Sequence, residues 1–71
     1  MNLRQIEAFR AVIETGSVSR AAERLSISQP AVSKLIQNLE YSTELPLFER
    51  RPGRILPTAE AFLLFEEIER I

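Results

Sequence analysis

The sequence contains no cysteine and no histidine among its 71 residues. Without cysteine the chain can form neither a disulfide nor a thiolate metal site, and without histidine any metal site would consist of carboxylates alone. The two glycines, Gly16 and Gly53, are isolated, which excludes a glycine-rich phosphate-binding loop. No apolar run approaches the roughly 20 residues that a membrane-spanning helix needs. We therefore expect no metal, no cofactor and no membrane contact.

Residues suited to catalysis are equally scarce. The ten carboxylates are scattered along the chain, and most fall on the expected outer faces of helices. Ser33 and Lys34 are neighbours in the sequence, but they need not meet as nucleophile and base. These patterns indicate that the chain is not an enzyme. The N-terminus shows no signal-peptide pattern, so we expect a cytoplasmic protein, and the length suits one small domain that buries only about 60% of its unfolded surface.

Residues 19–40 carry the strongest structural signal, with the sequence SRAAERLSISQPAVSKLIQNLE. Apolar residues repeat with helical spacing on both sides of the three-residue break Ser26-Ile27-Ser28. They are Ala21, Ala22 and Leu25 before the break, and Val32, Leu35, Ile36 and Leu39 after it. Two helices joined by so short a connection form a helix-turn-helix.

The opposite face of the second helix is polar and carries no carboxylate. At about 100° per residue, it presents Pro30, Ser33, Lys34 and Gln37, with Gln29 on its flank at the helix start. Amides read adenine edges, lysine reads guanine or phosphate, and serine can contact either base. The alternative interpretation is a solvated face, which would usually carry more Glu and Lys pairs. The pattern favours a face that reads DNA.

The starts of these two helices have clear capping residues. Ser28 is the predicted N-cap of the second helix, and Pro30 lies in its first turn, where a missing N–H costs nothing. Free N–H groups at a helix start also suit a phosphate oxygen, so we expect Ser28 to contact the DNA backbone as well. Ser17 is the predicted N-cap of the first helix, whose outer Arg20 and Arg24 either touch phosphates or are ordinary surface charge.

An earlier helix precedes this motif. Asn2 and Gln5 have the spacing of a capping box, and the helix is expected to run to about Thr15. Gly16 is placed to end it in a left-handed conformation. The predicted inner stripe consists of Leu3, Ile6, Phe9 and Ile13, with Val12 beside it.

Residues 46–58 change character and predict two short strands around a turn. Pro52-Gly53 at the central positions suits a type II turn. Arg50, Arg51 and Arg54 crowd the tip. They could be solvated charge, but like charges held close repel one another unless a partner is expected. The pattern favours a wing whose arginines contact phosphates or a narrow minor groove.

A last helix is expected after the N-cap Thr58, with Glu60 in its first turn, where the helix dipole favours an acid. One apolar stripe contains Ala61, Leu64, Phe65, Ile68 and Ile71. Phe62 and Leu63 point elsewhere, about 100° or more from the centre of that stripe. We expect the stripe to cover the first helix and these two residues to face a partner.

The charge balance is uneven along the chain. The net charge of the whole chain is −1, which by itself does not favour DNA. Residues 16–58 hold six Lys or Arg and four Glu, a net charge of +2, whereas residues 59–71 carry a net charge of −3. Because the local field matters more than the overall charge for contact with phosphate, the acidic end can face away from a duplex.

The stretch AAERLSISQPAVSKLIQNLE, followed by PLFER, resembles the N-terminal DNA-binding domain of LysR-type transcriptional regulators. The resemblance runs from about Leu3 to Thr58 and more loosely to the end. It implies a last helix that pairs two subunits, and a much larger ligand-sensing domain beyond it. The sequence departs from the family at Thr43 and Glu44, where Leu and a helix-ending Gly are usual, and at Ala61, where Gly is more usual.

Together these patterns predict an all-α fold with a small β-hairpin wing. Residues 1–58 would form the winged helix-turn-helix, residues 59–71 the start of a dimerisation helix, and the effector-binding domain would be absent. The predicted partner is double-stranded DNA with a two-fold repeat, bound by a weak homodimer, and a small-molecule effector would bind only a longer parent protein. The alternative is an interaction module that pairs with full-length regulators and binds DNA poorly.

Overall fold

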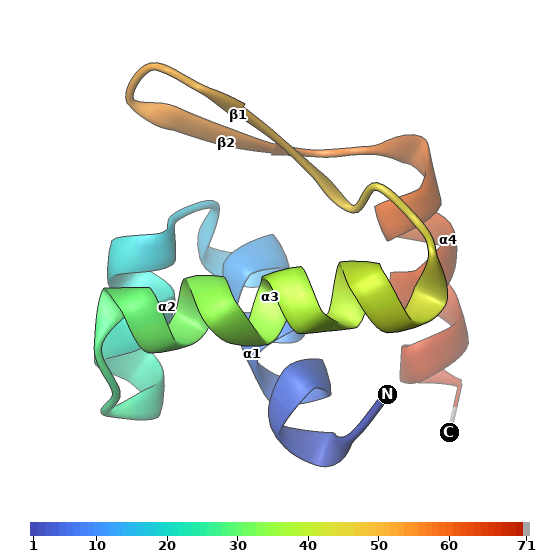
Figure 1. Ribbon diagram of the computed structural model, residues 1–71, viewed down its shortest axis with the longest axis horizontal. Helices are drawn as coiled ribbons and strands as arrows, with labels where there is room; N and C mark the ends of the chain where they lie inside the picture. Colours follow the sequence, from blue (N-terminus) through green and yellow to red (C-terminus); the bar gives the residue numbers. More distant parts are fainter. Residues whose placement is uncertain (71) are drawn as a thin grey trace.

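The computed structural model describes residues 1–70 and contains four helices and one hairpin in that range (Figure 1). The elements are α1 (Leu3–Thr15), α2 (Val18–Leu25), α3 (Gln29–Thr43), β1 (Phe48–Arg51), β2 (Arg54–Pro57) and α4 (Ala59–Glu69). The hairpin runs alongside α3, with its base near α4 and its tip near the start of α3 (Figure 1). The predicted all-α fold with a β-hairpin wing is confirmed, whereas Ile71 of the last apolar stripe lies outside the described residues.

Local capping chemistry sets the helix boundaries as the sequence predicts. Asn2 and Gln5 form a complete capping box at the start of α1. Gly16 ends α1 with a φ of 71°, a left-handed conformation that glycine adopts without steric cost. Ser17 caps α2 by accepting the backbone N–H of Arg20 at 3.1 Å. The N-caps each satisfy a terminal N–H that has no partner within its own helix, and the Gly16 N–H donates to the terminal carbonyl of Val12 at 2.8 Å.

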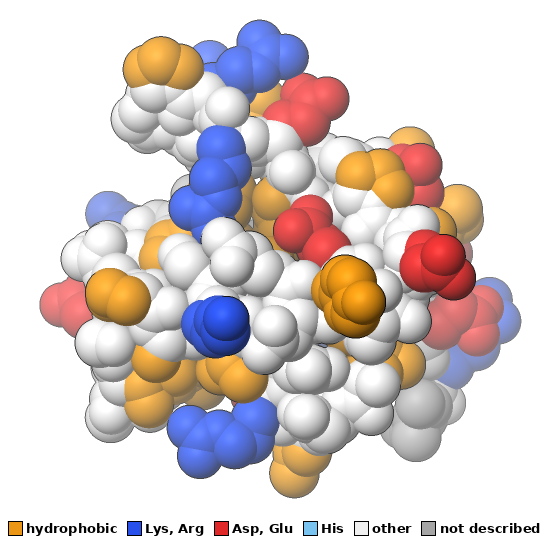
Figure 2. Space-filling model, in the orientation of Figure 1, with side chains coloured by type: hydrophobic (Ala, Val, Ile, Leu, Met, Phe, Trp, Pro, Cys, Tyr) orange, Lys and Arg blue, Asp and Glu red, His pale blue; other side chains and the backbone are white. Residues whose placement is uncertain are grey.

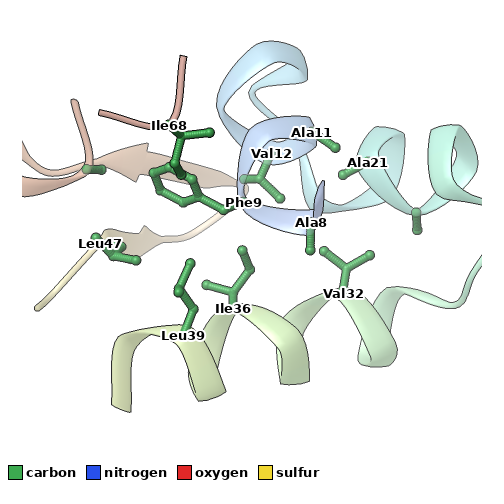
Figure 3. Packing of buried hydrophobic residues seen from close by; sticks show 12 residues of the cluster. Ala8, Phe9, Ala11, Val12, Ala21, Val32, Ile36, Leu39, Leu47 and Ile68 are labelled. Carbon is green, nitrogen blue, oxygen red and sulfur yellow. The ribbon is translucent and has the colours of Figure 1, made fainter. Parts of the chain in front are cut away.

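The core lies between α1 and α3 and is closed by the wing base and α4 (Figure 3). Phe9 is fully buried, and its ring lies 5.8 Å from the ring of Phe48 at a tilt of 59°. Ala8 points toward Val32 of α3 (Figure 3), so small side chains allow the two helices to approach closely. The buried apolar residues are Ala8, Phe9, Ala11, Val12, Ala21, Ala22, Val32, Ile36, Leu39, Leu47, Ala61 and Ile68.

The predicted inner stripe of α1 is confirmed for Phe9 and Val12, which are buried, but it is wrong for Leu3. Leu3 is 70% exposed, whereas Gln5 and Ala8 are buried. Leu3 lies about 120° around the helix from Phe9. The buried face extends instead toward the alanines of α1, because α2 and α3 both pack on this side of the helix. Ile6 and Ile13, at the edge of this face, are partly buried against the core.

The last helix has the division of faces that its sequence predicts. Ala61 and Ile68 are buried, and Leu64 and Phe65 pack partly against the core. Ile68 lies beside Phe9 of α1 (Figure 3), and Arg10 of α1 forms an ion pair with Glu69 at 3.0 Å. Among residues 1–70 no helix is long and apolar enough to cross a membrane.

Candidate nucleic-acid interface

Helix α3 lies across one face of the molecule and presents its polar side outward. Val32, Ile36 and Leu39 are buried on its inner side, which fixes the rotation of the helix about its axis. As a result Lys34 and Gln37 are exposed and Ser33 is half-buried. The face predicted to read bases is therefore available to a ligand along the whole length of the helix.

The start of α3 is built as the sequence predicts. The Ser28 hydroxyl accepts the backbone N–H of Ala31 at 3.1 Å, and Pro30 lies in the first turn. Ser28, Gln29 and Pro30 are all exposed. Pro30 has no N–H and Ala31 donates its own to Ser28, so the donors that the start of α3 can offer an anion are the Ser28 hydroxyl and the backbone N–H of Gln29.

The wing is a short antiparallel hairpin in which Arg51 pairs with Arg54 across the two-residue turn Pro52-Gly53. Gly53 has a φ of 69°, which is the positive value that the third position of a type II turn requires. Arg50, Arg51 and Arg54 are all exposed. The tip is therefore a compact basic projection, in which Arg51 also forms an ion pair with Glu49 at 3.2 Å.

The wing and α3 contact each other directly. The Arg50 guanidinium donates to the hydroxyl of Ser33 at 3.3 Å. A serine hydroxyl that accepts this bond keeps its own hydrogen for donation to another group. Arg50 and Ser33 thus place a cation and a free hydroxyl donor on one continuous surface.

A groove lies between the wing tip and the starts of α2 and α3. Gln29 lines it together with the three predicted wing arginines, and so do Ser17 and Ser19 at the start of α2. The structure therefore brings Gln29 and the arginines together into one site, while Lys34 and Gln37 lie farther along α3. Phe62 and Leu63 are on α4, away from this site, and are 54% and 64% exposed.

The charge distribution matches this geometry. Basic side chains lie on the wing and the front of α3, and a group of acidic ones lies toward the end of the molecule that holds α4, while other acidic side chains lie on the wing and beside α3 (Figure 2). Glu66, Glu67 and Glu69 of α4 are exposed. The sequence leaves open whether Arg20 and Arg24 of α2 touch phosphates or are ordinary surface charge. Arg24 forms an ion pair with Glu14 at 2.6 Å, which supports its interpretation as surface charge. The wing and α3 form the face suited to a polyanion.

Two contributions to the site were missed by sequence reasoning. The start of α2 lines the groove, which depends on how the helices cross and leaves no local sequence signal. Glu40, on the inner edge of α3, accepts the backbone N–H groups of Leu47 and Phe48 at 2.8 and 3.2 Å. A carboxylate seven or eight residues before a strand is too common a pattern to have identified this contact.

Comparisons with protein families and with known proteins all lead to one family. A family model described as bacterial regulatory helix-turn-helix protein, lysR family, matches residues 3–62. The chain is 56% identical over 70 residues to the octopine catabolism/uptake operon regulatory protein OccR of Rhizobium meliloti, covering 99% of this chain and 24% of OccR. It is 47% identical to the transcriptional activator protein LysR of Escherichia coli, covering 99% of this chain and 22% of that protein. The chain thus spans about a quarter of the length of these relatives.

Solved structures share the fold over nearly the whole chain. The DNA-binding domain of CbnR, in its complex with DNA, superimposes with a TM-score of 0.94 at 37% identity, covering 99% of this chain and 80% of that one. A LysR-family regulator from Eggerthella lenta gives a TM-score of 0.89 at 38% identity, covering 97% and 99%. The relatives described here are transcriptional regulators. The chain belongs to the lysR family of bacterial regulatory helix-turn-helix proteins.

Proposed function

We propose that α3 enters the major groove and that Gln29, Ser33 and Lys34 read base edges there, with Gln37 as a weaker contributor. The proposal is supported by the exposed polar face of α3, which carries amides, a hydroxyl and one cation and no carboxylate. Glutamine pairs with adenine, and lysine with guanine. The Ser28 hydroxyl and the backbone N–H of Gln29 bind a backbone phosphate at the edge of the groove.

The wing supplies the second part of this interface. Arg50, Arg51 and Arg54 contact phosphates or an adjacent narrow minor groove, which attracts arginine through its negative potential. The observation that carries the proposal is the bond from Arg50 to Ser33, because it joins the wing to the base-reading face. One duplex can therefore contact both at once.

Two copies of the domain would bind a two-fold repeat. Phe62 and Leu63 are the exposed apolar residues of α4, and Leu63 continues into an apolar patch with Leu45 and Leu64. We propose that this face pairs with the same face of a second copy. A two-fold dimer presents two recognition helices to two half-sites, which increases specificity.

The wider setting follows from the family. The chain would act as the N-terminal DNA-binding part of a longer cytoplasmic regulator, in which residues 1–58 bind DNA and residues 59–71 begin the dimerisation helix. A small-molecule effector would bind elsewhere in that longer protein. No catalytic role is proposed, since the relatives act as regulators. The comparisons favour DNA binding over the alternative of an interaction module that binds DNA poorly.

The test is in vitro selection of DNA sites with the chain and its Gln29→Ala variant. Loss of one good base contact should cost about 1–3 kcal/mol on the preferred site, so the variant should select a broader set of sequences at one position of each half-site. Lys34→Ala serves as a second base-reading variant. An unchanged profile with Gln29→Ala would show that the recognition face is misassigned.

A further inference from the structure

Glu40 connects the recognition helix to the wing. It lies in the last turns of α3, it is half-buried, and one of its carboxylate oxygens accepts the backbone N–H groups of both Leu47 and Phe48. These two residues form the base of the wing, where the chain enters β1. One side chain of α3 therefore holds the backbone of the wing directly.

The hairpin geometry explains why the Phe48 N–H needs an external partner. Thr58 donates its backbone N–H to the carbonyl of Leu47 at 3.0 Å, so Leu47 and Thr58 occupy the position of a hydrogen-bonded pair, although Leu47 donates its own N–H to Glu40 and not back to Thr58. Such pairs alternate along an antiparallel ladder, and the next pair, Phe48 with Pro57, is not hydrogen-bonded. The Phe48 N–H thus points away from β2 and toward α3. Without Glu40 it would be left on the open edge of the strand.

The remaining contacts link the position of the wing base to the positions of the wing arginines. Leu47 is fully buried, and the Phe48 ring packs against Phe9. Arg50 lies two residues farther along β1, on the same face as Phe48, and reaches Ser33. A shift of the wing base relative to α3 would therefore move Arg50 and the tip arginine Arg54 away from the surface that α3 presents.

We propose that Glu40 is a positioning residue for DNA recognition, which fixes the wing against α3 so that both contact one duplex. The inference rests on the proposed DNA interface and adds a residue that touches no DNA. A positioning role and a purely electrostatic role predict opposite effects on DNA binding when Glu40 is removed. A carboxylate close to a polyanion repels it, so neutralising Glu40 would strengthen binding if the side chain only contributed charge. Loss of the anchor would weaken binding.

The test measures DNA affinity of Glu40→Ala and Glu40→Gln across a series of salt concentrations. Each phosphate contact contributes about 0.9 to the magnitude of the slope of log K against log salt concentration. One contact therefore raises the association constant by a factor of about eight when the salt falls from 1 M to 0.1 M. Glu40→Ala should weaken binding at 0.1 M by about this factor and reduce the slope by about 1. Glu40→Gln keeps an acceptor oxygen and should recover part of the loss.

Glu49→Gln is the matched control. Glu49 is an exposed wing carboxylate that forms an ion pair with Arg51. Within residues 1–70 its side chain accepts no hydrogen bond from a backbone N–H of α3 or of the wing base. Its neutralisation should leave binding equal or tighter. Circular dichroism establishes that each variant is folded, and Glu40→Gln carries the test if Glu40→Ala unfolds.

A double-variant comparison separates positioning from general loss of stability. If Glu40 acts through the wing, Arg54→Ala should cost less in the Glu40 variant than in the parent, because the wing is already displaced. Lys34→Ala should cost the same in both. Binding by the Glu40 variants that equals or exceeds the parent, or losses with Arg54→Ala that multiply, would overturn the inference. If Lys34→Ala and Arg54→Ala have no effect on the parent, the proposed interface itself fails.

Discussion

Glu44 occupies a backbone position that suits glycine, and Glu44→Gly should stabilise the domain. Residue 44 ends α3 with a φ of 57° and is exposed. A left-handed conformation costs a residue with a Cβ about 1–2 kcal/mol. Glycine avoids this cost, but the greater freedom of its unfolded chain offsets about 0.5–1 kcal/mol of the resulting stabilisation. Removing an acidic charge from a helix C-terminus adds about 0.3–1 kcal/mol.

The net expectation is a gain of about 1 kcal/mol in the free energy of unfolding, which raises Tm by about 4–8 °C for a domain of this size. Urea and thermal melts followed by circular dichroism measure it. Glu44→Ala is the first control, since it removes the charge and keeps the Cβ, and it should gain only the part due to the dipole. Ser26→Gly is the second, because Ser26 also has a φ of 57° and carries no charge.

The outcome that refutes this reasoning is a midpoint for Glu44→Gly that stays level or falls. Residue 44 would then not be held in the left-handed conformation in solution. If Glu44→Ala gains as much as Glu44→Gly, the backbone contributes nothing and the carboxylate alone is unfavourable. In that case the gain should shrink as salt is raised, because salt screens an exposed charge at a helix end.

Three further predictions follow from the same structure. Arg51→Ala should weaken binding to all DNA sequences alike and lower the salt slope by about 1; a change in the selected sequence instead would place Arg51 against a base. Phe62→Glu should reduce cooperative binding to a two-fold site and leave half-site affinity unchanged, whereas Leu3→Glu, at another exposed apolar residue, should change neither quantity; sedimentation showing equal dimerisation for Phe62→Glu and the parent would remove α4 from the interface. Phe9→Ala should cost about 3–5 kcal/mol, a large part of the roughly 4–10 kcal/mol that stabilises a 71-residue domain, so melts should show a strongly lowered midpoint; a loss below about 1 kcal/mol would mean that the Phe9 site collapses without a cavity.

The parts of the fold that could be predicted are those set by local chemistry. Ser17, Ser28 and Thr58 cap their helices because a hydroxyl three residues before a backbone N–H satisfies it. Gly53 turns the hairpin because it accepts a positive φ. Each of these needs only a few neighbouring residues, so the sequence contains the whole cause. The outer face of α3 follows similarly from the spacing of its buried residues.

The parts that could not be predicted depend on contacts between elements. Leu3 belongs to an apolar stripe by its spacing, but α2 and α3 approach α1 on the side of its alanines and leave Leu3 exposed. Glu40 resembles any acid on a helix surface until the wing base is placed beside it. The contact between Arg50 and Ser33 joins residues 17 apart in the sequence. Periodicity identifies the faces of a helix, but only the packed structure shows which neighbour each face meets.

The arrangement of charges explains how a chain with a net charge of −1 can bind DNA. Lys34 and the arginines at positions 50, 51 and 54 are the cations of the wing and α3, and all four are exposed. Glu40 is bound to backbone N–H groups, and Glu49 to Arg51, so neither carboxylate is freely directed at a phosphate. If each of these four cations contacts one phosphate, together they contribute about −3.6 to the salt slope of one domain, which corresponds to weak binding. Two domains on a two-fold site would double that number, so the proposed pairing through α4 would make binding both tighter and more specific.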